Sequence, residues 1–131
     1  MIIADTCVWI DYFNGKPCLE TDILDQKLEN DLVAIGDLIL LEILQGFKAD
    51  KDYNLARKTL LLLIQKEFLG KTLALKASEN FRMLRKKGIT IRKTNDVIIA
   101  SYCIENKTPL LFSDKDFLPF VKHLSLIPVL K

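Results

Sequence analysis

The sequence predicts an α/β fold, namely a three-layer α/β/α sandwich around a mainly parallel sheet. Short apolar runs alternate along the chain with longer segments whose apolar residues have helical spacing. Strands separated by helices favour a parallel sheet, because each connection then crosses over one face of it. The chain has 131 residues, and neither an internal repeat nor a low-complexity tract divides it. Since this length suits one domain with one core, we predict a single domain over residues 1–131.

The first half of the chain predicts two strands and three helices. The opening apolar run stops at Asp5, as a buried strand does when it reaches the edge of a sheet. A Gly-Lys-Pro break at 15–17 separates the first two helices, and the second has apolar residues on one face and acids on the other. Asp37 can cap the third helix, which ends near Gly46. The predicted elements are a strand at 1–4, helices at 6–13 and 20–29, a strand at 32–35 and a helix at 38–47.

The second half predicts three helices and two strands. Gly88 ends the middle helix, because glycine readily adopts the left-handed conformation that terminates helices. The last helix is apolar nearly all round, so we expect it to be buried. Residues 68–75 are compatible with either a strand or a loop. The predicted elements are helices at 50–66, 77–87 and 95–106, and strands at 110–112 and 126–130.

The rare residue types restrict the possible chemistry to carboxylates. The chain contains one histidine, His123, so histidine triads and histidine-based metal sites are excluded. Its three cysteines, Cys7, Cys18 and Cys103, form an odd number without a Cys-x-x-Cys pair. This pattern argues against both a disulfide framework and a zinc knuckle. Any hydrolytic reaction must therefore depend on Asp and Glu.

We expect a cytoplasmic protein with no role in a membrane. Asp5 and Asp11 stand where a signal peptide would need a basic start and an uninterrupted apolar stretch. The longest apolar runs fall far short of the roughly 20 residues that span a bilayer. Unpaired cysteines also fit the reducing cytoplasm.

Charge is distributed unevenly along the chain. Residues 1–52 contain 11 acidic and 4 basic residues, whereas residues 53–131 contain 6 acidic and 15 basic residues. This asymmetry suits a protein that holds cations at one place and a polyanion at another, although solvated helix faces would produce it as well. The candidates for phosphate contacts are Arg82, Arg85, Lys86, Lys87, Arg92 and Lys93.

Four acidic residues stand where a parallel sheet places its ligands. Ligands bind beyond the carboxyl ends of such strands, at the point where strand order reverses. Asp5 ends the first predicted strand, and Asp114 follows the third. Asp96 lies in the first turn of the buried helix, where the helix dipole favours a negative group. Glu42 lies between apolar neighbours in its helix, and an unpaired buried carboxylate is energetically costly.

A bound divalent cation would explain all four positions together. Mg²⁺ prefers oxygen ligands and keeps several waters, so a few carboxylates and a substrate phosphate suffice to hold it. Such an ion promotes phosphodiester hydrolysis. Each acid also has a structural alternative: Asp5 as a turn residue, Asp96 and Asp114 as helix caps, and Glu42 as the partner of a Lys or Arg. Thr6 either supports the site, by bonding Asp5 or a metal-bound water, or caps the next helix.

Four segments of the sequence resemble the signature segments of PIN domains. They are I-I-A-D-T-C-V-W-I-D at 2–11, L-L-E-I-L-Q-G at 40–46, T-N-D-V-I-I-A-S at 94–101 and L-L-F-S-D-K-D-F at 110–117. Their order and spacing are similar to those of bacterial and archaeal VapC toxins. The R-K-K-G-I-T-I segment at 85–91 matches as well, so the resemblance spans essentially the whole chain.

The resemblance implies a PIN-like fold and an endoribonuclease that depends on Mg²⁺ or Mn²⁺. It also implies a toxin that is silenced by a cognate VapB-like antitoxin and that forms a homodimer. Asp5, Glu42, Asp96 and Asp114 match the family's acidic quartet, and Asp116 competes with Asp114 for the fourth place. Ser113 departs from the residues usual at its position, which leaves the local register open.

Two other classes of function compete with a nuclease. The first is a non-catalytic PIN-like module that binds RNA or a protein, and the intact acids argue against it. The second is a phosphate-handling domain of the haloacid-dehalogenase or receiver type. The former needs an aspartate where Cys7 stands, and the latter needs an acidic pair where Asp5 has only Thr6 beside it. We therefore predict cleavage of single-stranded or loop RNA, where the choice of RNA over DNA depends on the resemblance alone.

Overall fold

Four short parallel strands form the central sheet of the protein. The computed structural model describes residues 1–130. The strands occur in the order β3-β2-β1-β4, and all three neighbouring pairs are parallel. In this register Ile3 pairs with Ala34 on one side and with Leu110 on the other. The strands are β1 (Ile2–Ala4), β2 (Val33–Gly36), β3 (Ile64–Lys66) and β4 (Leu110–Leu111).

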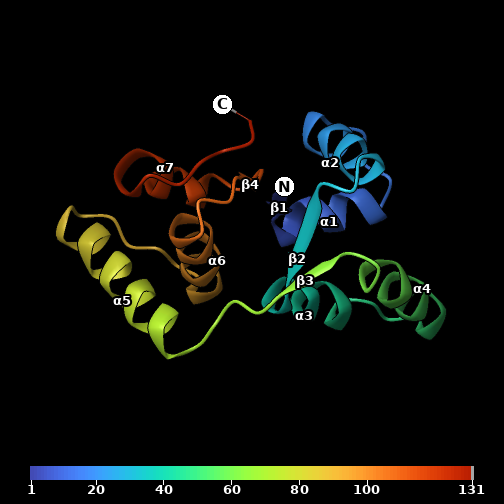
Figure 1. Cartoon of the computed structure of the whole chain (residues 1–131), viewed down its shortest axis with the longest axis horizontal. Coiled ribbons are helices and arrows are strands. Elements are labelled where there is room, and N and C mark those ends of the chain that lie inside the picture. The colour runs from blue at the N-terminus through green and yellow to red at the C-terminus, as the bar shows by residue number, and fades with distance from the viewer. Residues whose placement is uncertain (131) are drawn as a thin grey trace.

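Helices cover both faces of this sheet, as the sequence predicted. The connections from β1 to β2 and from β2 to β3 run in one direction along the sheet, and the connection from β3 to β4 returns past both. Because parallel connections are right-handed, α1 to α4 lie on one side of the sheet, and α5 and α6 lie on the other (Figure 1). The helices are α1 (Thr6–Phe13), α2 (Leu19–Glu29), α3 (Asp37–Gln45), α4 (Asp50–Leu60), α5 (Lys71–Lys86), α6 (Thr94–Glu105), the 3₁₀ turn η1 (Lys115–Phe117) and α7 (Leu118–Leu124).

The α6 helix is the most buried helix of the fold. Its residues from Asp96 to Ser101 are all buried, because it lies between the sheet and α5. Leu84 of α5 is fully buried against this core. Asn80 of α5 donates a hydrogen bond to the buried hydroxyl of Ser101, at 2.9 Å. The first turn of α6, which carries Asp96, is therefore held rigidly against the carboxyl edge of the sheet.

Gly36 and Phe68 fix the path of the chain beyond β2. A Cβ atom at Gly36 would overlap the Phe68 ring, so only glycine allows this ring to lie on the strand. The Phe68 backbone N–H donates to the Asp37 carboxylate at 3.0 Å. Asp37 thus holds the β3–α5 connection in addition to accepting from the N–H of Leu38 at the start of α3.

The sequence-based prediction was wrong for the end of one helix and for one strand. The predicted helix at 50–66 ends at Leu60, and its last residues form β3. The run from Leu60 to Ile64 is continuously apolar, and such a run has no period that distinguishes a helix from a strand. The predicted strand at 126–130 is only an isolated bridge from Pro128 to Leu110, because proline has no N–H to extend a ladder.

The remaining boundaries agree with the sequence within one or two residues, with one exception. The α5 helix begins at Lys71, directly after Gly70, whereas the sequence predicted a start at 77. The segment at 68–75, compatible with a strand or a loop, is therefore a short connection followed by the first turn of α5. The helix ends before Gly88, whose φ of 82° is left-handed as predicted. Among residues 1–130, none of the helices has the length and apolar character needed to cross a membrane.

Candidate active site

The strand order creates a switch point between β1 and β4. The connection that leaves β1 covers one face of the sheet, and the connection that enters β4 covers the other. A crevice therefore opens at the carboxyl ends of these two neighbouring strands. Asp5 follows β1 directly, and its backbone N–H donates to the carbonyl of Leu111 at 2.9 Å. Asp114 follows β4 three residues later, so both strand ends deliver a carboxylate to the same place.

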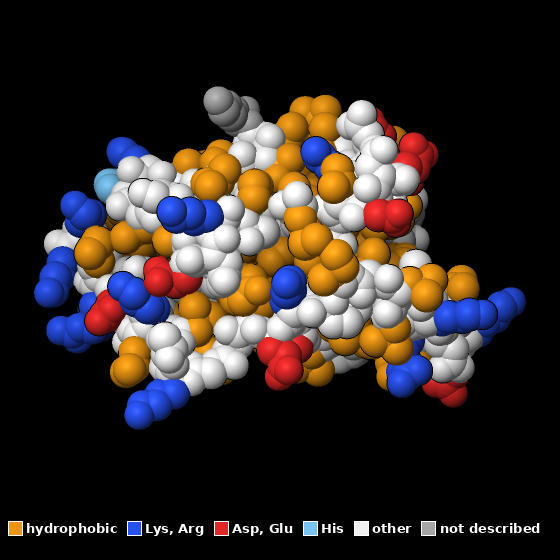
Figure 2. Space-filling view, viewed as in Figure 1, with side chains coloured by type: hydrophobic (Ala, Val, Ile, Leu, Met, Phe, Trp, Pro, Cys, Tyr) orange, Lys and Arg blue, Asp and Glu red, His pale blue; other side chains and the backbone are white. Residues whose placement is uncertain are grey.

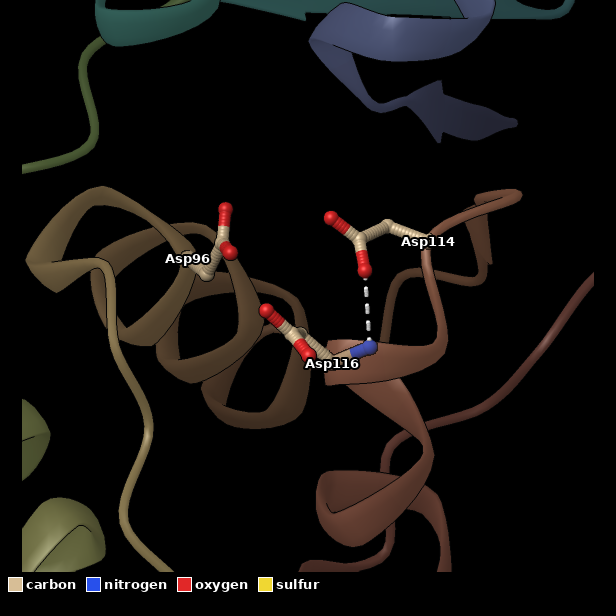
Figure 3. A group of neighbouring side chains, drawn as sticks. All are labelled: Asp96, Asp114 and Asp116. Carbon is tan, nitrogen blue, oxygen red and sulfur yellow. Dashed lines mark hydrogen bonds between the residues drawn. The ribbon is translucent and has the colours of Figure 1, made fainter.

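Three aspartates form the most compact group of carboxylates at this edge. One oxygen of Asp96, one of Asp114 and one of Asp116 all lie within 4.8 Å of one another. Figure 3 shows the three carboxyl groups facing the space between the first turn of α6 and the turn that leads into η1. Asp114 keeps its position because its Oδ1 accepts the backbone N–H of Asp116 at 2.9 Å. We call these three residues the acidic triad.

Glu42 lies beside the acidic triad and is held by two hydrogen-bond donors. The Thr6 hydroxyl donates to its Oε1 at 2.7 Å, and the Asn95 side-chain amide donates to its Oε2 at 3.2 Å. These donors come from α1 and α6, whereas Glu42 belongs to α3. The half-buried carboxylate therefore connects three helices in one orientation.

Asp5 is the most deeply buried carboxylate of the site, with 3% of its surface exposed. Burial raises its pKa from 3.8 to about 7, because the charged form loses its hydration. The backbone N–H of Thr6 opposes this rise, whereas the negative charges of Asp96 and Glu42 add to it. Asp5 is thus coupled to the other acids without a cation beside it.

The pKa of Asp96 is raised for the same reasons. Burial raises its pKa to about 6, with Lys93 acting against the rise and Asp114 and Glu42 adding to it. Its Oδ2 atom is buried and has no hydrogen-bond partner in the structure. A buried oxygen acceptor without a partner is uncommon and costly. Asp96 is the acid that both the acidic triad and the Asp5–Glu42 side of the site share.

This group of donors fits a divalent cation. The acids around Asp96 offer carboxylate oxygens, which are the ligands that Mg²⁺ and Mn²⁺ prefer. The unpartnered Oδ2 of Asp96 and the raised pKa values of Asp5 and Asp96 favour the binding of a positive charge inside the site. A metal ion placed there would supply it.

The outer side of the acidic triad, in contrast, is paired with two cations. Nη2 of Arg92 lies 3.2 Å from Oδ2 of Asp116, and Nζ of Lys93 lies 3.8 Å from Oδ2 of Asp114. Both basic side chains are mostly exposed. They belong to the segment that enters α6.

The other predicted phosphate-binding residues lie at the end of α5. Arg82, Arg85, Lys86 and Lys87 are exposed and form no ion pair within residues 1–130. The Arg85 guanidinium lies over the Phe81 ring, 5.6 Å from its centre. Figure 2 shows Lys and Arg side chains gathered at this end of the molecule. The six predicted basic residues thus divide into a pair at the acidic triad and a separate cluster on α5.

The structure brings together all of the acids that the sequence singled out. Asp114 and Asp116, treated as competitors, both belong to the acidic triad. Asp114 also caps η1, so it is both a helix cap and a member of the acidic triad. The Thr6 hydroxyl donates to Glu42, a partner that was not among the alternatives considered for it from the sequence, namely Asp5, a metal-bound water or the cap of the next helix.

One residue of the site was missed. Asn95 joins α6 to Glu42, and its position directly before Asp96 was the only signal in the sequence. Because the two residues are 53 positions apart, no local pattern could predict the bond between them.

Comparison with known proteins identifies the class of protein that this site belongs to. The sequence matches the PIN domain family over residues 2–120. The chain therefore belongs to the PIN domain family, as its four acidic segments predicted.

Relatives of known kind are similar over most of their length. VapC ribonuclease Mb1587 of Mycobacterium bovis and ribonuclease VapC11 of Mycobacterium tuberculosis are each 25% identical over 119 residues, which cover 89% of both chains. The crystal structure of VapBC2 from Rickettsia felis, bound to a promoter DNA fragment, matches with a TM-score of 0.72 and 24% identity. This match covers 98% of the present chain and 97% of the other. The structural match confirms the fold.

Proposed function

We propose that this protein is a metal-dependent endoribonuclease and the toxin of a type II toxin–antitoxin pair. The observation that carries the proposal is the convergence of carboxylates on the buried Asp96, whose Oδ2 has no partner. Membership of the PIN domain family and the ribonuclease names of its relatives support the same activity. We further propose that residues 1–131 form one domain and that the protein acts in the cytoplasm.

The acidic residues would have two different roles in hydrolysis, namely metal binding and proton transfer. Asp96, Asp114 and Asp116 would hold Mg²⁺ or Mn²⁺ together with Asp5. When bound, such an ion supplies activation of a water molecule and polarisation of the phosphoryl oxygen. Glu42 would accept a proton from the attacking water, because Thr6 and Asn95 hold its carboxylate in one orientation beside the reacting centre.

The basic residues would position the RNA. Arg92 and Lys93 lie at the rim of the acidic triad, and Arg85, Lys86 and Lys87 extend the positive surface along α5. Phosphate contacts of this kind fix the position of a strand without reading its sequence. A strand that lies across both groups would place one phosphate beside Asp96. Single-stranded or loop RNA reaches such a site most readily.

A small antitoxin would silence this site. The solved structures that share the fold include VapBC complexes, and the acidic site offers a partner a place for a basic side chain. An arginine can pair with two carboxylate oxygens at once and so exclude a metal ion. Expression of the chain alone should arrest growth, and co-expression of its antitoxin or the change Asp5→Asn should abolish the arrest. If cells that express the chain without any partner grow normally, the toxin assignment is refuted and the nuclease assignment still stands.

We also propose that the chain forms a homodimer, as the family resemblance implies. A groove of about 290 Å³ beside Asp37 is lined by Leu38, Leu41, Leu69 and Ile98. Leu41 is 58% exposed and Leu69 is 56% exposed, and exposed apolar surface of this kind is typical of protein interfaces. Light scattering of the purified protein should give twice the mass of one chain.

Chelation tests the enzymatic proposal. Cleavage of a single-stranded RNA should stop in EDTA, return with Mg²⁺ or Mn²⁺ and return poorly with Ca²⁺, because Ca²⁺ prefers larger and more flexible coordination. The Asp96→Asn variant, purified in the same way, controls for contaminating nucleases. Full cleavage in excess chelator would exclude a metal-dependent reaction.

A further inference from the structure

Two cations occupy the outer oxygens of the acidic triad. Arg92 contacts Oδ2 of Asp116 at 3.2 Å, and Lys93 lies 3.8 Å from Oδ2 of Asp114. Arg92 and Lys93 are consecutive residues directly before α6, whose first turn carries Asp96. The segment that brings the third carboxylate to the site therefore also brings the positive charges that neutralise the other two.

The two cations and a metal ion would compete for the same carboxylates. Oδ1 of Asp114 accepts the backbone N–H of Asp116, so Oδ2 is the oxygen that remains available, and this oxygen faces Lys93. The Arg92 contact likewise uses Oδ2 of Asp116. A divalent ion held by the acidic triad would therefore compete with the two basic side chains for the negative charge of Asp114 and Asp116, and at Asp114 for Oδ2 itself.

The two ion pairs are of a kind that a metal can displace. Each is a single contact, and the side chains of Arg92 and Lys93 are 78% and 59% exposed. Exposed pairs of this geometry contribute little to stability. A divalent ion brings twice the charge of one side chain and can interact with all three carboxylates at once. After displacement, both flexible side chains would remain beside the site with no anion to neutralise.

We propose that Arg92 and Lys93 are exchangeable counterions of the acidic triad, which pair with Asp116 and Asp114 until a metal ion binds and then turn to the phosphates of the RNA. The proposal rests on the proposed function for the identity of the polyanion. It makes the binding of metal and of RNA mutually favourable. Metal binding releases two cations for phosphate, and RNA that holds these cations leaves the carboxylates open to metal, as linkage requires.

The first test measures metal affinity without RNA. The double variant Arg92→Gln/Lys93→Met should bind Mn²⁺ about 3- to 10-fold more tightly than the wild type in calorimetry at low salt, because the competing charges are gone. The matched control is Lys86→Met/Lys87→Met, which removes the same charge from exposed positions on and just after α5. The control should bind Mn²⁺ as the wild type does. Equal or weaker Mn²⁺ binding by the Arg92/Lys93 variant, or an equal gain by the control, would overturn the proposal.

The second test measures RNA affinity in the Glu42→Gln background, which keeps all four proposed metal ligands and prevents cleavage under the proposed function. The salt dependence of binding to a single-stranded RNA should be steeper in Mn²⁺ than in EDTA. Two released cations add about 2 × 0.7 to the slope on a single strand. The Arg92→Gln/Lys93→Met change should remove this difference, and the Lys86/Lys87 control should keep it. A slope that is the same with and without Mn²⁺ in the parent protein would refute the exchange.

The two proposals can fail separately. If the wild type binds Mn²⁺ but never cleaves RNA, the proposed function fails, while the gain in Mn²⁺ affinity still establishes the competition. If the wild type cleaves RNA and the Arg92→Gln/Lys93→Met variant shows no gain in Mn²⁺ affinity, the nuclease assignment stands and the exchange is refuted.

Discussion

The inner and outer carboxylates of the site differ in what neutralises them. Asp5 and Asp96 are buried, have raised pKa values and form no ion pair within residues 1–130, although Lys93 lies close enough to lower the pKa of Asp96. Asp114 and Asp116 are partly exposed, and each contacts a basic side chain. Basic side chains of the chain therefore neutralise the outer carboxylates, whereas the inner carboxylates are not neutralised by an ion pair. Buried acids with raised pKa values that cluster in one place are typical of functional sites, and a cation from solution would neutralise them.

The largest effect is expected for the acid that both groups share. Asp96→Asn should lower RNA cleavage by at least about 10³-fold, because losing a metal-held charge at the reacting centre removes several kcal/mol of transition-state stabilisation. A gel assay with labelled RNA measures the change. Asp22→Asn, at an exposed position of α2, should leave cleavage unchanged. Equal loss in both variants would show that the defect is not specific to the site.

The second prediction separates the inner acids from the outer ones by pH. The pKa of Asp5 is raised from 3.8 to about 7 in the folded protein. The folded state therefore retains a proton that the unfolded state releases, and the metal-free protein loses stability as pH rises from about 4 to about 7. The difference in pKa corresponds to roughly 4 kcal/mol for this buried group.

Asp5→Asn should reduce this pH dependence, leaving the part that comes from the raised pKa of Asp96, and should also reduce cleavage by orders of magnitude. Denaturant unfolding in EDTA should show the variant to be more stable than the wild type at pH 8, and the advantage should shrink toward pH 4. Mn²⁺ should stabilise the wild type more than the variant. A wild type whose stability is flat between pH 4 and 8 in EDTA would contradict the raised pKa values inside the site.

The positions of Asp5 and Asp114 show how much of the site the sequence could predict. Asp5 and Asp114 were placed correctly because topology alone fixes where parallel strands end, and the order of strands and helices was visible in the apolar pattern. The bonds of Glu42 to Thr6 and Asn95 could not be predicted, since they join three helices that only packing brings together.

The sheet also contains features that the sequence alone could not predict. The strand β3 was hidden in the continuous apolar run that follows α4, and pairing with β2, a long-range contact, decides its conformation. The segment at 126–130 has the composition of a strand, but Pro128 limits its pairing to one bridge. The local pattern was sufficient where helical periodicity was clear, as in α2, and insufficient where tertiary pairing decided between helix and strand.

A smaller effect is expected for the donors that hold Glu42. Thr6→Val removes the 2.7 Å hydrogen bond to Glu42 at nearly constant volume. It should lower kcat about 10- to 100-fold with little change in KM, because residues that orient a reacting carboxylate typically contribute that much. Thr6→Ser keeps the hydroxyl and should restore most of the activity. A Thr6→Val protein with wild-type kcat would show that Glu42 needs no fixed orientation.

The smallest effect is expected farthest from the acidic triad. Replacing Arg85, Lys86 and Lys87 together with Gln or Met should weaken RNA binding and reduce its salt dependence by about 3 × 0.7. Mn²⁺ affinity should not change, because none of the three is paired with an acid of the site. Fluorescence anisotropy at several salt concentrations measures the slope. An unchanged slope would identify this cluster as a solvated helix face.

The most direct test of the account compares metal binding and catalysis in one preparation. Mn²⁺ bound to the protein is measured by electron paramagnetic resonance, and RNA cleavage is measured across the same Mn²⁺ titration. If the acids around Asp96 hold the catalytic ion, cleavage should rise with the occupancy of a protein-bound Mn²⁺, and Asp96→Asn should lose both. Cleavage that persists in chelator, or Mn²⁺ binding that survives Asp96→Asn unchanged, would contradict the account.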